Sequence, residues 1–281
     1  MNKDKQLKKA RFFKRLFPKK FPRHNPARLK FIAKIIEKKF LEGDELFCLP
    51  NDHVITIGKS IEKGPDTILP SRVVEHFIAK ASFRFVMHKC VCRECMPCKT
   101  YPHEIGCLFL GEPARDIHPD LGRELTVAEA LAHVRNAAAK GLVFSVGKSK
   151  LDTVWLGIGP GDKLFTICMC CPCCCITRGL VTGHPLLGRN YNRMPGLKMT
   201  VTEDCIGCGT CTEEGVCIFD AIHLEGGVAR INDNCKGCGR CAEKCPSQAI
   251  QAVIENQDYV DRTIERLNWK VDVTKPAGSP G

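Results

Sequence analysis

The chain has 281 residues, of which 42 are basic and 31 acidic, so its formal net charge is +11. Residues 1–40 hold 15 of the basic residues and only 2 of the acidic ones, which leaves the rest of the chain with a net charge of −2. This distribution excludes a uniformly basic nucleic-acid binder and indicates an acidic body with a basic N-terminal arm. The length allows two domains.

Cysteine is far more frequent than in ordinary proteins, with 20 residues in the chain. A disulfide-rich secreted scaffold would need an export signal, and we expect none, because the basic N-terminus lacks a long apolar run and twin arginines. The adjacent Cys173, Cys174 and Cys175 could hardly all find disulfide partners. The uncharged stretch 164–177 contains Pro172 and is too short to span a membrane. The composition therefore favours metal or cluster ligation in a reducing cytoplasm.

The first region in chain order, residues 1–43, is predicted to be a basic arm followed by an amphipathic helix. Phenylalanines and leucines lie among the lysines and arginines of residues 1–24. Asn25 and Pro26 are typical of a helix start, and Gly43 is typical of a helix end. Apolar residues at 29, 32, 36 and 40 would share one face of this helix.

Residues 44–177 are predicted to form a cysteine-rich domain of mixed α/β structure. Helices are expected over 71–81 and 127–140, the second with a capping box made by Thr126 and Glu129. Strands are expected as a pair within 44–60 and singly over 83–86, 142–146, 154–158 and 164–167. Mixed helices and strands place the chain in the α+β class.

The C-terminal third divides into three predicted segments. Residues 178–197 are rich in Gly, Pro, Asn and Arg and are expected to be a linker. Residues 198–254 form a compact cysteine module. Residues 255–281 are expected to contain a helix over about 256–268, followed by a disordered tail.

An internal repeat in residues 198–254 is the strongest signal in the sequence. Three cysteines of the first copy recur in the second with an offset of 30 residues, and a fourth recurs with an offset of 28. Three cysteines at i, i+3 and i+6 can bind three corners of one iron–sulfur cube, and the glycines between them let backbone amides approach the cluster. The fourth ligand then comes from the other copy. We therefore assign one [4Fe–4S] cluster to Cys205, Cys208, Cys211 and Cys245, and the other to Cys235, Cys238, Cys241 and Cys217.

This module resembles the bacterial-type ferredoxins that bind two [4Fe–4S] clusters. The second copy, CKGCGRCAEKCP, has the full C-x2-C-x2-C-x3-C-P pattern of that family. The first copy has two more residues before Cys217, and Ile218 replaces the proline. The resemblance implies a pseudo-two-fold arrangement of strand pairs and helices, with Gly226-Gly227 as a hairpin turn. Triplets with a remote fourth cysteine argue against zinc here.

Eleven of the other twelve cysteines form two groups about 60 residues apart, and each group is expected to follow a strand. Ends of neighbouring strands would bring the groups together. The isolated Cys48 is expected to be a small buried apolar residue. The two groups are Cys90, Cys92, Cys95, Cys98 and Cys107, and then Cys168, Cys170, Cys171, Cys173, Cys174 and Cys175.

Three interpretations of these eleven cysteines remain open. They could hold one or two further iron–sulfur clusters that exchange electrons with the module. They could bind zinc, with His88 or His103 as extra ligands. They could also be redox-active thiols or an open cluster site that acts on a substrate. This half of the chain resembles the cysteine-rich part of uncharacterised ferredoxin-like proteins from anaerobes, which implies no particular reaction.

The sequence as a whole favours an electron-transfer protein of the [4Fe–4S] ferredoxin type over a catalyst. The alternatives are an oxidoreductase with a catalytic cluster or thiol site in the N-terminal half, and a redox sensor that responds to cluster loss. The expected partners are proteins that donate and accept electrons. The basic arm is expected to dock an acidic partner or an anionic membrane. Nucleic acid is not an expected partner, because the arm offers no residues for the recognition of bases. We expect a cytoplasmic protein of an anaerobe.

Overall fold

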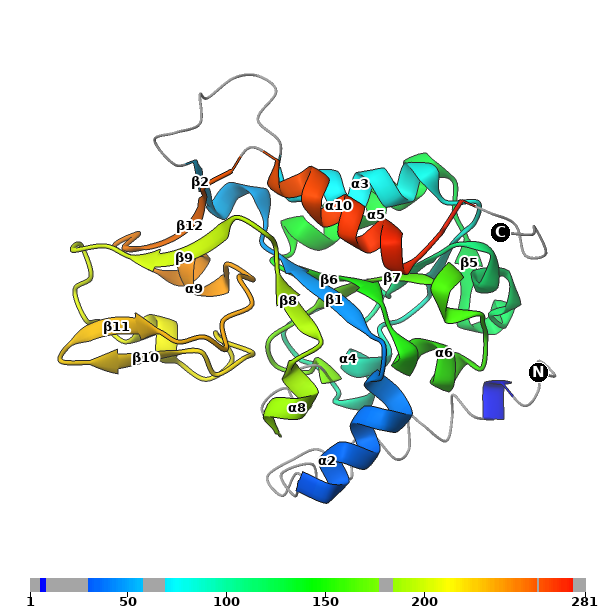
Figure 1. The fold of residues 1–281 in the computed structure, drawn as a ribbon, viewed down its shortest axis with the longest axis horizontal. Helices are drawn as coiled ribbons and strands as arrows, with labels where there is room; N and C mark the ends of the chain where they lie inside the picture. The colour runs from blue at the N-terminus through cyan, green and yellow to red at the C-terminus, as the bar shows by residue number, and fades with distance from the viewer. Residues whose placement is uncertain (1–5, 9–29, 58–68, 177–183, 257, 275–281) are drawn as a thin grey trace.

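The structure is a computed structural model that describes residues 6–8, 30–57, 69–176, 184–256 and 258–274. It contains both helices and strands, as expected for an α+β protein. Figure 1 shows a large sheet with helices on both sides, and the C-terminal strands beside the edge of that sheet where β8 lies.

The large sheet has seven strands in the order β5-β3-β4-β7-β6-β1-β8. Neighbouring strands are antiparallel, except that β8 runs parallel to β1. The strands predicted near residues 83–86, 142–146 and 164–167 are confirmed as β3, β6 and β7. The seven strands are β1 (Glu45–Leu49), β3 (Arg84–Met87), β4 (Leu108–Leu110), β5 (Gly122–Glu124), β6 (Val143–Lys148), β7 (Phe165–Cys170) and β8 (Tyr191–Arg193).

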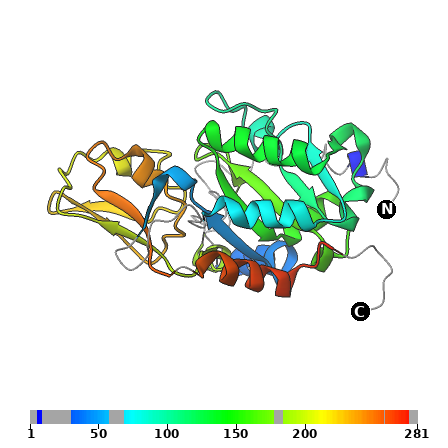
Figure 2. The ribbon, with the colours of Figure 1, turned by 90° about the horizontal axis from the view of Figure 1, so that it is seen from above.

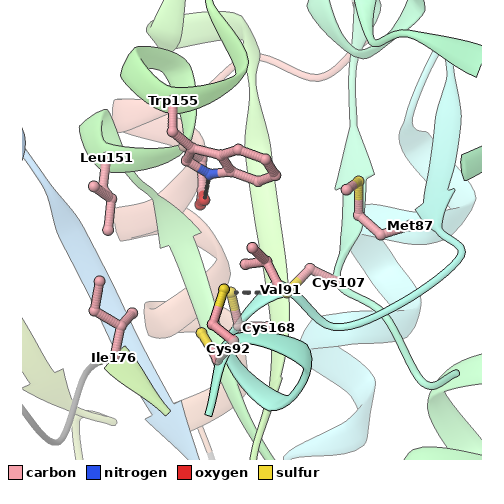
Figure 3. A pocket seen from close by; sticks show the side chains of 10 residues that line it. Met87, Val91, Cys92, Cys107, Leu151, Trp155, Cys168 and Ile176 are labelled. Atoms are coloured by element: carbon pink, nitrogen blue, oxygen red, sulfur yellow. Dashed lines mark hydrogen bonds between the residues drawn. The ribbon is translucent and has the colours of Figure 1, made fainter. Parts of the chain in front are cut away.

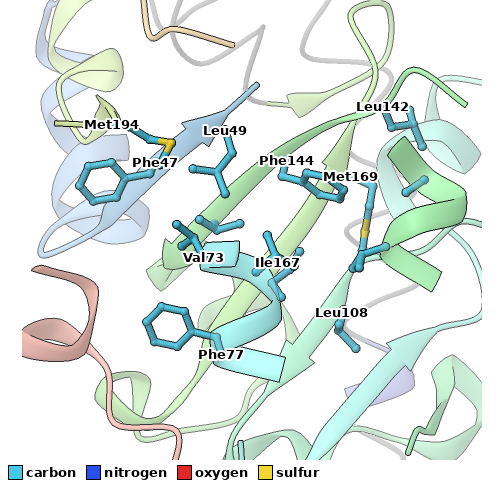
Figure 4. Close-up of a cluster of buried hydrophobic side chains, with 14 of the residues drawn as sticks. Phe47, Leu49, Val73, Phe77, Leu108, Leu142, Phe144, Ile167, Met169 and Met194 are labelled. Atoms are coloured by element: carbon cyan, nitrogen blue, oxygen red, sulfur yellow. The ribbon is translucent and has the colours of Figure 1, made fainter. Parts of the chain in front are cut away.

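One face of this sheet packs against helices α3 (Ser71–Lys80), α5 (Val127–Ala139) and α10 (Tyr259–Lys270). Figure 2 shows these helices lying along the sheet, and Figure 4 shows the apolar side chains between the layers. Phe165, Ile167 and Met169 of β7 point into this core, and the Phe165 ring stacks on Phe77 with 4.1 Å between the ring centroids.

The alternate residues of the same strands point to the opposite face, because successive side chains of a strand alternate. On β7 these residues are Thr166, Cys168 and Cys170. Pairing places Cys48 of β1 opposite Ser145 of β6, and Ser145 opposite Cys168. The sheet therefore has a helix-covered apolar face and a second face that carries thiols.

Helix α5 confirms the predicted capping box. The Thr126 side chain accepts a hydrogen bond from the Glu129 amide, and the Glu129 side chain accepts one from the Thr126 amide. Gly141 follows the helix with φ +71°, a conformation that glycine adopts without strain.

Two predicted strand assignments in the N-terminal half are wrong. Residues 154–158 belong largely to helix α6 (Lys150–Leu156), which Ser149 caps at its start and the left-handed Gly157 ends. These caps outweigh the strand preference of the β-branched residues between them. The pair expected within 44–60 does not form either, because β2 (Ile55–Ile57) pairs with β12 and not with β1.

The C-terminal module contains two strand pairs and two short helical segments. Strand β12 pairs antiparallel with β9 and parallel with β2, and β10 pairs antiparallel with β11. Gly226 and Gly227 form the predicted hairpin turn, with φ values of +57° and +78°. The elements are β9 (Leu197–Val201), a 3₁₀ turn (Thr210–Thr212), β10 (Ile222–Glu225), β11 (Val228–Ile231), α9 (Arg240–Lys244) and β12 (Ile250–Ile254).

Segments on both sides of the module pack back onto the large sheet. The described part of the predicted linker contains α8 (Pro185–Gly188) and β8. The expected C-terminal helix is confirmed as α10, whose Arg266 and Lys270 pair with the buried Glu45 of β1. The segments that precede and follow the module therefore both attach it to the large sheet.

The N-terminal helix is present as α2 (Lys30–Ile36), which continues as a π-helical segment (Glu37–Leu41). Ala33 and Leu41 are buried against Leu187 of α8. Residues 9–29, with the predicted helix start and most of the basic arm, lie outside the described residues, as does 275–281 of the tail. Among the described residues, no helix is both long and apolar enough to span a membrane.

We expect that Ile167→Val lowers the free energy of unfolding by about 1 kcal/mol, because it removes one methyl group from the core while keeping a β-branched residue in β7. Urea unfolding followed by circular dichroism under anaerobic conditions measures this change. Ile35→Val is the matched control, because Ile35 is 60% exposed, and it should change the free energy by less than about 0.5 kcal/mol. Equal effects of both variants would contradict the assigned core.

Candidate metal centres

The eight cysteines of the C-terminal module lie on loops and short helical turns. Each triplet runs into a helical segment, and that segment is preceded by a left-handed glycine, Gly209 or Gly239. Gly207 also has a positive φ, and a Cβ atom there would lie 2.2 Å from the Gly227 carbonyl oxygen. Glycine at 207 therefore lets the first cysteine loop approach the hairpin turn.

The structure brings each triplet together with the fourth cysteine of the other repeat. Burial raises the pKa of Cys211, and the nearby thiols of Cys205, Cys208 and Cys245 raise it further. Around the second triplet, burial raises the pKa of Cys238 to about 12, and the Cys217 and Cys235 thiols add to this effect. Cys217 also contributes to the raised pKa of Cys241. The two crossed sets predicted from the repeat are thus neighbours in space.

Backbone amides point at several of these sulfurs. The Ala221 amide donates to Cys217 Sγ at 3.3 Å, and the Ala229 amide donates to Cys205 Sγ at 3.4 Å. Such bonds favour a negatively charged sulfur. Amide donors, glycine-lined loops and paired thiol sets together fit the anionic [4Fe–4S] group that the sequence implies.

The two residues that follow Cys217 have a structural role that the sequence did not reveal. Ile218 and Phe219 are both buried. Phe219 lies 6.3 Å from the ring of Tyr191 in β8, measured between centroids. The residues around Cys217 therefore pack the module against the edge of the large sheet.

The eleven N-terminal cysteines also come together, because β4 and β7 are neighbours and the two cysteine segments flank them. They divide into two sets and one further residue. The four-thiol group has all four sulfurs within 4.8 Å of one another and consists of Cys98, Cys171, Cys173 and Cys174. The six-thiol group is an extended series of contacting thiols that consists of Cys90, Cys92, Cys107, Cys168, Cys170 and Cys175.

Within the six-thiol group, two sulfur–sulfur contacts are short. Cys107 Sγ lies 3.5 Å from Cys168 Sγ, a contact drawn as a dashed line in Figure 3. Cys175 Sγ lies 3.3 Å from Cys170 Sγ. Hydrogen bonds from Cys107 and Cys92 lower the pKa of Cys90, although its burial opposes this. The group therefore favours a thiolate at its centre.

A cavity of about 40 Å³ lies beside this group (Figure 3). Its wall includes Asp152, whose pKa burial raises, and whose carboxylate accepts hydrogen bonds from Trp155 Nε1 and Thr166 Oγ1. The eleventh cysteine, Cys95, is buried in the same wall. The cysteines that line the cavity are Cys92, Cys95, Cys107 and Cys168.

The buried Arg93 lies between the two thiol groups. It is fully buried, and its guanidinium donates to the backbone oxygens of Met169, at 2.9 Å, and Ile105. Burial alone would lower the pKa of Arg93, but the Cys90, Cys171 and Cys107 thiols outweigh it and raise the pKa. A buried cation needs a compensating negative charge, and here the ionisable groups around it are thiols.

Two further residues connect the module with the N-terminal thiols, and the sequence pointed to neither. Cys48 is buried as expected, but it is not isolated, because Cys238 and Cys175 are close enough to raise its pKa beyond the effect of burial. Arg240, buried beside Cys238, donates to the carbonyl oxygens of Gly141 at 2.7 Å and Cys170 at 3.4 Å.

The two histidines considered as zinc ligands lie outside the four-thiol group. His103 Nε2 forms a hydrogen bond of 2.8 Å with the Cys98 carbonyl oxygen, and His88 is exposed. His103 therefore supports the backbone of a thiol-bearing loop.

Comparison with known proteins identifies one segment of the chain. Residues 228–251 match the family described as 4Fe-4S binding domain, and this match includes the second cysteine repeat. Neither a curated protein nor a solved structure matches the chain. The chain is thus an iron–sulfur protein with a ferredoxin-like 4Fe-4S binding segment, in which further cysteines gather at a second place.

Proposed function

We propose that this protein is an electron carrier whose C-terminal module, residues 198–254, binds two [4Fe–4S] clusters. The observation that carries the proposal is the crossed placement of Cys245 beside the first triplet and of Cys217 beside the second. A bound cluster of this type accepts and returns one electron at a time. The protein supplies thiolate ligands and amide donors to sulfur.

The six-thiol group is the proposed ligand set of a further cluster. It offers more thiols than a single tetrahedral ion can use, and they are arranged as a series of contacts. Arg93 supplies positive charge beside Cys90 and Cys107. Anionic iron–sulfur ligation at this place accounts for a guanidinium buried without a carboxylate partner in the described part of the chain.

Cys48 and Arg240 make the proposed link between the module and the six-thiol group. Cys48 lies near both Cys238 and Cys175, and Arg240 reaches from Cys238 to the Cys170 carbonyl oxygen. This connection favours electron exchange between the second cluster of the module and the N-terminal thiols.

A second candidate function is an oxidoreductase with its reaction site in the N-terminal half. The cavity of about 40 Å³ favours it, because thiols and a buried carboxyl group line a space for a very small molecule. Loss of turnover in Cys168→Ala, with the signals of the C-terminal clusters intact, would support this candidate over a pure carrier.

The proposed partners are electron-donating and electron-accepting proteins, and the proposed location is the cytoplasm of an anaerobe. All twenty cysteines are free thiols in the structure, which supports a reducing compartment. Docking of an acidic partner or an anionic membrane remains the proposal for the basic arm.

We expect anaerobically purified protein to contain at least about eight iron and eight labile sulfide ions per chain, since two clusters of four irons occupy the module. A further N-terminal cluster would raise both numbers together. Elemental analysis and a sulfide assay give the counts, and low-temperature EPR after reduction with dithionite detects magnetic coupling between neighbouring clusters. Folded protein that is colourless and free of iron would refute the proposed function.

A further inference from the structure

The four-thiol group has the spacing of a site for a single metal ion. Cys173 Sγ lies 3.5 Å from Cys98 Sγ and 3.6 Å from Cys174 Sγ, and all four sulfurs lie within 4.8 Å of one another. Four Zn–S bonds of about 2.3 Å in a tetrahedron place the sulfurs about 3.8 Å apart. The sulfurs therefore need little movement to surround one ion.

The same spacing is too compact for a four-iron cluster. Each thiolate of such a cluster binds a different iron at a separate corner, so the four sulfurs must stand further apart. Across the described residues, no other set of three or more potential ligands is this compact, and the eight cysteines of the C-terminal module form no such set. The four-thiol group thus differs in kind from the proposed cluster sites.

The local chain arrangement closes this site from two directions. Cys98 comes from the turn after α4 (Val91–Cys95), where its amide donates to the Arg93 carbonyl oxygen at 2.9 Å. The other three thiols come from the turn that follows β7, so residues more than 70 positions apart meet here. Four thiolates complete a tetrahedron and leave no position for a substrate, as in structural zinc sites.

Charge compensation agrees with a metal at this site, and the same Arg93 also faces the Cys90 and Cys107 thiols of the six-thiol group. A divalent ion with four thiolates carries a net charge of about −2. The fully buried Arg93 lies near the Cys171 thiol, which is among the groups that raise its pKa, and it has no carboxylate partner among the described residues. A cation in this position is costly beside neutral thiols and favourable beside an anionic metal site.

We propose that Cys98, Cys171, Cys173 and Cys174 bind one structural zinc ion, separate from the iron–sulfur clusters of the proposed function. Zinc accepts tetrahedral thiolate ligation without a geometric penalty and binds such sites more tightly than ferrous iron does. The ion joins the turn after α4 to the turn after β7 and so holds one wall of the six-thiol group in place.

Two exposed thiols allow a matched test. Cys173 belongs to the four-thiol group and Cys208 to the first triplet of the module, and both are exposed, so alanine at either position leaves no buried cavity. The full chain is purified without air from zinc-supplemented medium and dialysed against a chelator. Zinc, iron and sulfide are then counted in the wild type, in Cys173→Ala and in Cys208→Ala, and circular dichroism checks that each protein is folded.

The wild type is expected to keep about one zinc per chain, and X-ray absorption at the zinc edge should find four sulfurs at about 2.3 Å. Cys173→Ala should lose most of its zinc while keeping iron and sulfide, and Cys208→Ala should keep its zinc while losing between one and four irons from the single module cluster that it serves. Iron in place of zinc in the wild type, equal zinc in both variants, or loss of sulfide in Cys173→Ala would overturn the assignment. The iron and sulfide counts of the wild type test the proposed function, whereas the zinc count tests the zinc site. Either proposal can therefore fail without the other.

Discussion

In Cys245→Ala, we expect loss of the cluster proposed for the other repeat, the one that also uses Cys205, Cys208 and Cys211. The physical reason is the crossed geometry, in which Cys245 lies close enough to raise the pKa of Cys211 although more than 30 residues separate them. Three thiolates leave one iron of the cube without a protein ligand, and that iron is easily lost, so this site should lose between one and four irons. The cluster bound by the Cys245 repeat itself should persist.

Double variants separate crossed ligation from ligation within one repeat. If Cys245 and Cys208 serve the same cluster, Cys208→Ala should add little to the iron loss of Cys245→Ala, because both changes damage one site. Cys241→Ala combined with Cys245→Ala should damage both sites, and the two losses should add. The measurements are iron and sulfide per chain and the loss of magnetic coupling in the EPR spectrum.

The opposite pattern would contradict the crossed assignment. Full additivity of Cys245→Ala with Cys208→Ala, together with no added loss from Cys241→Ala, would place Cys245 with its own repeat. Cys48→Ala serves as a control for removing a buried thiol near the second triplet, and it should leave the iron count unchanged.

The sequence predicted best those features whose signals lie close together along the chain. The repeat spacing placed each triplet on a turn, the Gly226-Gly227 pair predicted the hairpin, and Thr126 with Glu129 predicted the start of α5. In each case the residues that decide the structure are within a few positions of one another. Local conformational preference and local hydrogen bonding are therefore enough to define these elements.

Features that depend on contacts between distant segments could not be predicted in the same way. The β-branched residues of β2 predicted a strand, but its partner is β12, about 200 residues later. The helix α6 was missed because Val154 and Ile158 resemble strand residues, while the caps that define the helix lie at Ser149 and Gly157. Pairing partners depend on tertiary packing, which the alternation of residue types in one segment does not encode.

The candidate sites show the same division. The sequence grouped eleven N-terminal cysteines by position, whereas the structure sorts them by the direction of their side chains into four, six and the single Cys95. Alternation along β7 sends Cys168 and Cys170 to the thiol-bearing face, while the following turn carries Cys171 and its neighbours to the four-thiol group. Arg93 gave no signal of its own, because only burial among sulfurs distinguishes it from a surface arginine.

Arg93→Met is expected to lower the free energy of unfolding by about 3 to 5 kcal/mol and to reduce the N-terminal metal content, because it leaves buried negative charge without its cation. It also removes the donors for the Met169 and Ile105 carbonyl oxygens. Arg93→Lys should have a smaller effect, since an ammonium group keeps the charge but cannot serve both oxygens with a rigid fork. Anaerobic urea unfolding and metal analysis measure both consequences.

Arg84→Met is the matched control for this prediction. Arg84 also donates to backbone carbonyl oxygens, those of Ile78 and Ala81 at 2.7 Å and that of Ala79 at 3.4 Å. Its environment contains the carboxylate of Glu124 rather than thiols. Arg84→Met should lower the free energy of unfolding somewhat, because the hydrogen bonds are lost, and it should leave the metal and sulfide content unchanged. If the thiols around Arg93 were neutral, methionine would relieve an uncompensated buried charge, and Arg93→Met would be neutral or stabilising. The sign of the change in unfolding free energy therefore tests whether the N-terminal sulfurs form an anionic metal centre.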